Sequence, residues 1–169
     1  MQRWLYRREL AKLAPAKVYY LAACGVAHRL HRESGRAPRG ERIYEAVAGQ
    51  RRERTRVIAA CQGSKLVAPL TFAGTGNTEV VDAYFANVLL PVLPQGSVLV
   101  LDNARFHQSP STAALVAAAG GELCFLPAYS PDLNPMEHLW AARKTRLRKD
   151  LPTAANPGLF IGNICLSYC

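Results

Sequence analysis

The sequence lacks the features that would direct it to an oxidising compartment or a membrane. Its five cysteines are odd in number and form no CxxC pair, so neither a disulfide framework nor a cysteine zinc site is indicated. The charged N-terminus has no apolar core typical of a signal peptide, and no apolar run is long enough to span a membrane. We therefore expect a cytoplasmic protein without a membrane partner.

Acidic residues are also scarce. The chain has 12 Asp and Glu against 21 Lys and Arg, which gives a formal net charge of +9 at pH 7. This excess favours a polyanionic partner such as nucleic acid, although a soluble basic protein without such a partner fits the charge equally well. With 169 residues, half of them hydrophobic, the chain is expected to form one core.

Runs of β-branched residues and helical spacing of apolar residues predict an α/β fold with a mixed sheet flanked by helices. Pro69 marks its segment as an edge or bulged strand. Residues 25–53 are predicted to form a basic, partly extended excursion, and the role of residues 151–169 is not readable. The expected strands are 18–21, 54–61, 66–74, 98–101 and 122–127, and the expected helices are 79–90, 109 or 111 to 119, and 135–150.

Two carboxylates are predicted to meet at the carboxyl edge of this sheet. Asp102 follows the apolar strand 98–101, and Glu137 falls in the first turn of a helix that Asn134 would cap. Each has a structural alternative, because Asp102 could form a turn and Glu137 could close a capping box. Together they are more typical of a Mg²⁺ site that also binds substrate phosphates.

The segments LDNARFH and FLPAYSPDLNPMEHLW, followed by a basic helix, resemble the catalytic domain of DDE transposases. The match is best to the bacterial insertion-sequence branch of the mariner superfamily, and 34 residues separate Asp102 from Glu137, as that family requires. The resemblance implies a ribonuclease H-like domain over residues 17–150, between a lead-in (1–16) and a tail (151–169). It also implies DNA cleavage and strand transfer at transposon ends, with Asp102 and Glu137 as catalytic, metal-binding carboxylates.

Further expectations come from the same resemblance. The cofactor would be Mg²⁺, with Mn²⁺ as a substitute, and the partner would be double-stranded DNA, at the transposon ends and at the target. A homodimer and a bacterial cytoplasm, at the nucleoid when DNA is bound, are also implied. Such transposases carry helix-turn-helix domains before the catalytic domain, whereas here the first strand begins about seventeen residues into the chain. Sequence-specific recognition is therefore expected to be weak.

The first acid of the family pattern is missing. In the family that Asp ends the first strand and commonly bridges both metal ions, and the matching position here is Ala22. Ala23 and Ala27 stand where relatives carry further acids. Because alanine cannot bind a metal, the chain is predicted to cleave DNA poorly or not at all.

Several basic and polar residues surround the predicted carboxylates. In the last helix they are expected to contact phosphates, although they could instead form a solvated helix end. Asn103 and His107 are placed at the edge of the site, where they would orient phosphate or water or cap a turn. The candidate DNA-binding residues are Arg143, Lys144, Arg146, Arg148 and Lys149, with Arg36, Arg39 and Arg42 as weaker ones in the excursion.

Three functions remain open from the sequence. The first is an impaired transposase catalytic domain. The second is a non-catalytic DNA-binding or inhibitory transposase fragment, which the retained basic surface and the alanine pair would suit. The third is an unrelated metal-dependent phosphohydrolase with a similar sheet.

Overall fold

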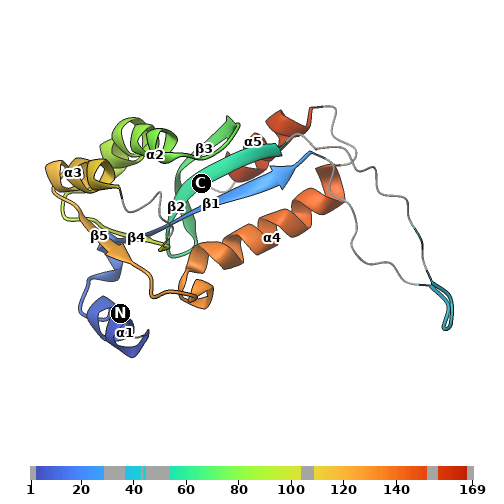
Figure 1. Cartoon of the computed structure of the whole chain (residues 1–169), viewed down its shortest axis with the longest axis horizontal. Helices are drawn as coiled ribbons and strands as arrows, with labels where there is room; N and C mark the ends of the chain where they lie inside the picture. Colours follow the sequence, from blue (N-terminus) through green and yellow to red (C-terminus); the bar gives the residue numbers. More distant parts are fainter. Residues whose placement is uncertain are drawn as a thin grey trace.

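The computed structural model describes residues 3–28, 37–42, 44, 54–103, 109–151 and 156–166. Helices and strands alternate along most of this chain (Figure 1). Their bounds are α1 Arg3–Leu10, β1 Val18–Ala27, β2 Arg54–Gln62, β3 Lys65–Ala73, α2 Thr78–Tyr84, β4 Val98–Leu101, α3 Pro110–Ala118, β5 Glu122–Phe125, α4 Pro135–Asp150 and α5 Pro157–Leu166. Helix α2 continues through a π-helical turn, Phe85–Leu89, and a 3₁₀ turn, Leu90–Val92.

The five strands form one sheet in the order β3-β2-β1-β4-β5. Strand β2 pairs antiparallel with β1 and β3, whereas β4 runs parallel to β1 and β5. The predicted mixed sheet is therefore confirmed. Strand β3 lies at an edge and its register with β2 shifts between Ile58 and Ala60, so the prediction from Pro69 is confirmed as well.

Helices cover both faces of the sheet (Figure 1). Side chains alternate between the two faces along each strand, so each strand contributes to both cores. In β1, Tyr19 and Leu21 join the core under α2 and α3. Ala22 and Val26 lie on the opposite face, in the core formed with α4 and α5. Helix α1 packs on this second face through Tyr6, which joins Val18 and Val100.

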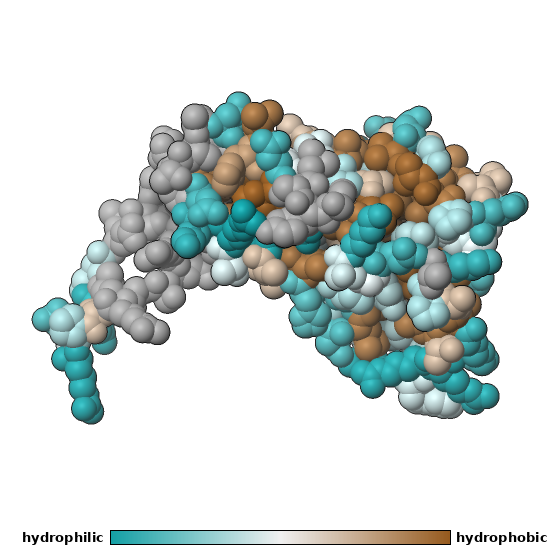
Figure 2. Space-filling view, turned by 180° about the vertical axis from the view of Figure 1, so that it is seen from behind, coloured by the Kyte–Doolittle hydropathy of each residue, from teal (hydrophilic) through white to brown (hydrophobic). Residues whose placement is uncertain are grey.

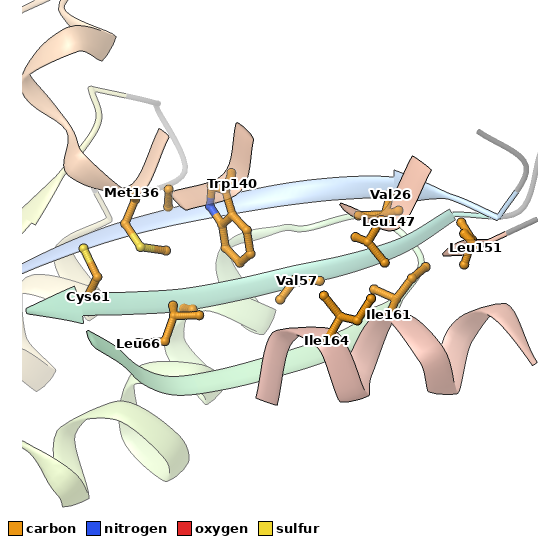
Figure 3. Close-up of a cluster of buried hydrophobic side chains, with 12 residues drawn as sticks. Val26, Val57, Cys61, Leu66, Met136, Trp140, Leu147, Leu151, Ile161 and Ile164 are labelled. Carbon is orange, nitrogen blue, oxygen red and sulfur yellow. The ribbon is translucent and has the colours of Figure 1, made fainter. Parts of the chain in front are cut away.

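One stripe of α4 faces the sheet (Figure 3). Met136, Trp140 and Leu147 recur at helical spacing and are at most 2% exposed. Trp140 is thus a core residue. Ile161 and Ile164 of α5 complete this core over β2 and β3. The C-terminal residues 156–166, whose role the sequence did not reveal, therefore contribute to the main core.

The first strand is longer than predicted. It was expected over residues 18–21, but β1 continues to Ala27 because its antiparallel pairing with β2 extends to Ala27 and Arg54. Ala22 accordingly lies within the strand and not at its end, and the excursion begins after Ala27, not at Gly25. No helix among the described residues has the length and apolarity needed to cross a membrane.

Candidate functional site

Asp102 emerges where β4 leaves the sheet. The four residues of β4 are all buried, and Asp102 and Asn103 directly after them are exposed. Val100 of β4 belongs to the core that α1 forms on the α4 side of the sheet, whereas Leu99 and Leu101 face α2 and α3. Alternation along the strand therefore directs Asp102 towards the face that α4 covers.

The start of α4 is fixed by Asn134, which is only 2% exposed. Its side-chain oxygen accepts a hydrogen bond from the backbone N–H of Met136 at 3.0 Å, so the predicted N-cap is confirmed. Its side-chain amide donates to the carbonyl oxygen of Leu21 in β1 at 3.2 Å. This second bond, which the sequence did not reveal, ties the first turn of α4 to the middle of β1.

The end of β4 and the capped start of α4 bring the predicted carboxylates together. Asp102 and Glu137 line one cavity of about 180 Å³, together with Asn103, Asn134 and Tyr129. Glu137 is exposed in the first turn of α4, where the helix dipole favours a negative charge. The predicted convergence at the edge of the sheet is thus present in the structure.

Ala22 and Asp102 each lie two residues beyond the last residue pair between β1 and β4. The last β1–β4 pair is Tyr20 with Val100, and each strand then advances two residues to reach Ala22 and Asp102. Ala22 is 5% exposed and belongs to the core cluster that contains Met136. By alternation, its methyl group lies on the face of the sheet that α4 covers. Ala23 is exposed and, by alternation, belongs to the other face of the sheet.

The donors present suit one hard cation and not a pair. Mg²⁺ is commonly held by one or two carboxylates, with water and substrate phosphates completing its six ligands. Asp102 and Glu137 meet that requirement for a single ion. Within the described part of the chain no group of three or more His, Cys, Asp or Glu residues could hold a metal.

The loop between β5 and α4 is held by α1. The Arg3 guanidinium donates to both carboxylate oxygens of Asp132, one of them at 3.0 Å, and also to the hydroxyl oxygen of Ser130 at 3.4 Å. The hydrogen bonds from Arg3 lower the pKa of the Asp132 carboxyl below its ordinary value. The N-terminal segment, predicted as a lead-in, thus supports the loop that borders the cavity.

The basic residues of α4 lie on two different faces. Arg143 belongs to the stripe that faces the sheet and is 8% exposed, so it is largely buried, whereas the sequence prediction placed it on the DNA-binding surface. Lys144 is half-buried, and Arg146 and Lys149 are exposed. Arg146 also pairs with Asp150, with its Nε 3.8 Å from a carboxylate oxygen.

The structure does not place the remaining predicted site residues at the cavity. Residues 37–42, with Arg39 and Arg42, are exposed and lie far from the sheet, in teal at the lower right of Figure 1. The structure therefore does not bring Arg39 to the cavity. Arg36 and His107 lie outside the described residues, as does the side chain of Arg148.

Comparison with known proteins assigns this arrangement to a family. The model of the DDE superfamily endonuclease domain matches residues 17–156. No curated protein sequence matches the chain.

Three solved structures illustrate the likeness in fold. A Mos1 transposase paired-end complex with the left transposon end is 18% identical with a TM-score of 0.69, over 85% of this chain and 46% of that one. A Mos1 mariner paired-end complex with Mn is 17% identical with a TM-score of 0.69, over 98% and 56%. The Mos1 catalytic domain is 16% identical with a TM-score of 0.61, over 98% and 85%. The predicted ribonuclease H-like fold is thereby confirmed, and the chain spans about half the length of the first two transposases.

Proposed function

Because the chain belongs to the DDE superfamily endonucleases, we propose that it is the catalytic domain of a transposase, impaired in DNA cleavage by Ala22. The domain would belong to the bacterial insertion-sequence branch of the mariner superfamily and act in the cytoplasm. Its substrate class is double-stranded DNA at transposon ends and at the target. The observation that carries the proposal is the cavity lined by Asp102 and Glu137, with Ala22 buried in the adjacent strand β1.

The impairment follows from the chemistry of the site. In two-metal phosphodiester cleavage, one ion activates the attacking oxygen and the other stabilises the leaving oxygen. Asp102 and Glu137 suit one Mg²⁺ or Mn²⁺ ion, so these two carboxylates alone do not hold the pair of ions that this step needs. These carboxylates would instead hold a single ion against a DNA phosphate.

The cations of α4 that lie outside its buried stripe support contact with the DNA backbone. At a rise of 1.5 Å per residue, Lys144 and Lys149 lie about 10 and 18 Å along the helix from Glu137. Phosphates of one strand recur every 3.4 Å along duplex DNA, so this helix could contact phosphates about three to five base pairs from the carboxylates. Lys144, Arg146 and Lys149 are the residues we assign to this contact. The net charge of +9 agrees with such a partner.

A second candidate is a non-catalytic DNA-binding or inhibitory transposase fragment that would dimerise with active subunits. The packing of Ala22 into the core favours this second candidate, because the alanine is buried among core residues at the position predicted for the missing acid. The two candidates differ in whether restoring one carboxylate is enough to restore cleavage.

The test is Mg²⁺- and Mn²⁺-dependent nicking of plasmid DNA by the chain, by Ala22→Asp and by Ala23→Asp. The third protein is a matched control, because it carries the same new carboxylate one residue further, on the opposite face of the sheet. We expect only Ala22→Asp to nick, and we expect Asp102→Ala to abolish that activity. DNA binding is measured in parallel by gel shift, to confirm that every variant still engages the substrate.

The other outcomes are equally informative. Nicking by the unaltered chain that disappears in Asp102→Ala would refute the impairment. DNA binding by all variants without any nicking would favour the non-catalytic fragment. Hydrolysis of small phosphoesters without DNA binding would refute both and favour the unrelated phosphohydrolase.

A further inference from the structure

The indole N–H of Trp140 is a buried donor without an acceptor. Trp140 is 2% exposed, and its Nε1 has no hydrogen-bond partner in the part of the chain that the structure describes. Apolar residues reach the surface in several places, brown among teal in Figure 2, and such exposure is ordinary in a folded protein. A buried N–H that bonds to nothing is the unusual case, because its lost hydration is not replaced. An acceptor next to Trp140 would remove this cost.

Trp140 packs over the row of smallest side chains in this core. On the face that α4 covers, three successive pairs run along β1 and β2, namely Tyr20 with Cys61, Ala22 with Ala59, and Cys24 with Val57. The Trp140 ring lies between Cys61 and Val57 along β2 in Figure 3, and these three residues belong to one core cluster. The pair between those two points is Ala22 with Ala59. Ala22 is therefore the β1 residue that the indole ring covers.

The unpaired N–H is directed towards the start of α4. Asn134, which caps this helix, donates to the carbonyl oxygen of Leu21 at 3.2 Å, so the helix begins beside the residue that precedes Ala22. In Figure 3 the ring nitrogen of Trp140 lies on the edge of the ring that is nearer to Met136, in the first turn. The donor thus faces the end of the core that borders the candidate site.

We propose that Trp140 is a positioning residue, whose indole N–H would hold a side-chain acceptor at position 22 and is left unpaired by Ala22. The inference rests on the proposed function and deepens it, since it adds a protein donor to the predicted position of the missing acid. The indole N–H can only donate, and a methyl group cannot accept. An aspartate at position 22 could accept through one oxygen, which would orient the other oxygen towards a metal ion.

The test observes the indole N–H directly by ¹H–¹⁵N NMR. The chain has two tryptophans and therefore two indole signals, and Trp4→Phe assigns the signal of Trp140. In Ala22→Asp and in Ala22→Asn, we expect the Trp140 indole proton to move downfield. We also expect it to exchange with solvent about tenfold more slowly than in the unaltered chain, as one additional hydrogen bond implies. The asparagine variant carries the acceptor without a buried charge, so it provides the test even where the aspartate variant does not fold.

Two control variants separate the hydrogen bond from packing. Ala22→Leu adds a side chain of similar shape to aspartate and asparagine but has no acceptor, so it should not produce the downfield shift. Ala23→Asn places the same amide one residue further, on the opposite face of the sheet, and should leave the Trp140 signal unchanged.

The catalytic consequence is measured in the Ala22→Asp background. Adding Trp140→Phe keeps an aromatic ring and removes the N–H. Partners that orient a metal ligand typically contribute ten- to a hundredfold to metal affinity. The Mg²⁺ concentration for half-maximal nicking should therefore rise by about tenfold or more, which loss of packing alone would not cause.

The two measurements fail in different ways. A Trp140 signal that stays in place in both Ala22→Asp and Ala22→Asn, or that moves equally in Ala22→Leu, would overturn the inference without touching the proposed function. An unchanged Mg²⁺ requirement after Trp140→Phe would also overturn the positioning role. A shifted signal in Ala22→Asp without any nicking would instead refute the proposed function, while the hydrogen bond itself would stand.

Discussion

The double hydrogen bond of Asn134 leads to a quantitative prediction for Asn134→Ala. Losing the N-cap of a helix costs about 1 kcal/mol. The change also removes the donor to the Leu21 carbonyl, and leaving a buried carbonyl without a partner costs about 1–3 kcal/mol. The free energy of unfolding should therefore fall by about 2–4 kcal/mol, which lowers the melting temperature of a domain of this size by about 4–16 °C.

Asn77 offers a matched control for this measurement. It caps α2 in the same way, accepting from the backbone N–H of Val80 at 3.0 Å, but its side chain is exposed. Asn77→Ala should cost about 1 kcal/mol, or about 2–4 °C. Both variants are compared with the unaltered chain by urea denaturation and by calorimetry. Equal losses in the two variants would show that the bond to Leu21 adds nothing beyond capping, and would refute its role in placing Glu137.

Two more predictions concern the contacts around the site and the C-terminal helix. Asp132→Asn should lower the urea midpoint at pH 7. The difference from the unaltered chain should disappear as the pH falls through the folded-state pKa of Asp132, because a lowered carboxyl pKa stabilises the fold only while the group is ionised. A difference that persists at acid pH would contradict the ion pair. Ile161→Ala should cost about 2–5 kcal/mol because that side chain is fully buried, whereas Leu159→Ala, which removes a 67% exposed side chain from the same helix, should change stability by less than about 0.5 kcal/mol. Similar losses in these two variants would mean that α5 does not belong to the core.

Local patterns were sufficient for most of the elements and for the two carboxylates. The apolar run at 98–101 and the Asn134-Pro135 start of α4 are short-range signals, because burial and capping depend on neighbouring residues. The motif around them carried the family resemblance, which the match over residues 17–156 supports. The roles of Asp102 and Glu137 stay predictions until the nicking assay is done.

Contacts between distant segments determined the features that local patterns did not predict. The length of β1 depends on its pairing with β2 across the excursion, and an apolar run alone does not indicate how far such a pairing extends. The burial of Arg143 depends on which face of α4 meets the sheet, which Trp140 and Leu147 determine by packing. The amide of Asn134 reaches Leu21, more than a hundred residues away in sequence.

The sequence by itself determined which residues are candidates for the site. It supplied the order of strands and helices, the two predicted carboxylates and the alanine at the position predicted for a third, because these are properties of residue types and their spacing. Only the tertiary structure decided that Ala22 is buried within β1, that α1 anchors the loop at the cavity, and that Tyr129 is exposed beside it. Such features depend on how hydrogen bonds and packing bring distant backbone segments together, and that information resides in no single stretch of the chain.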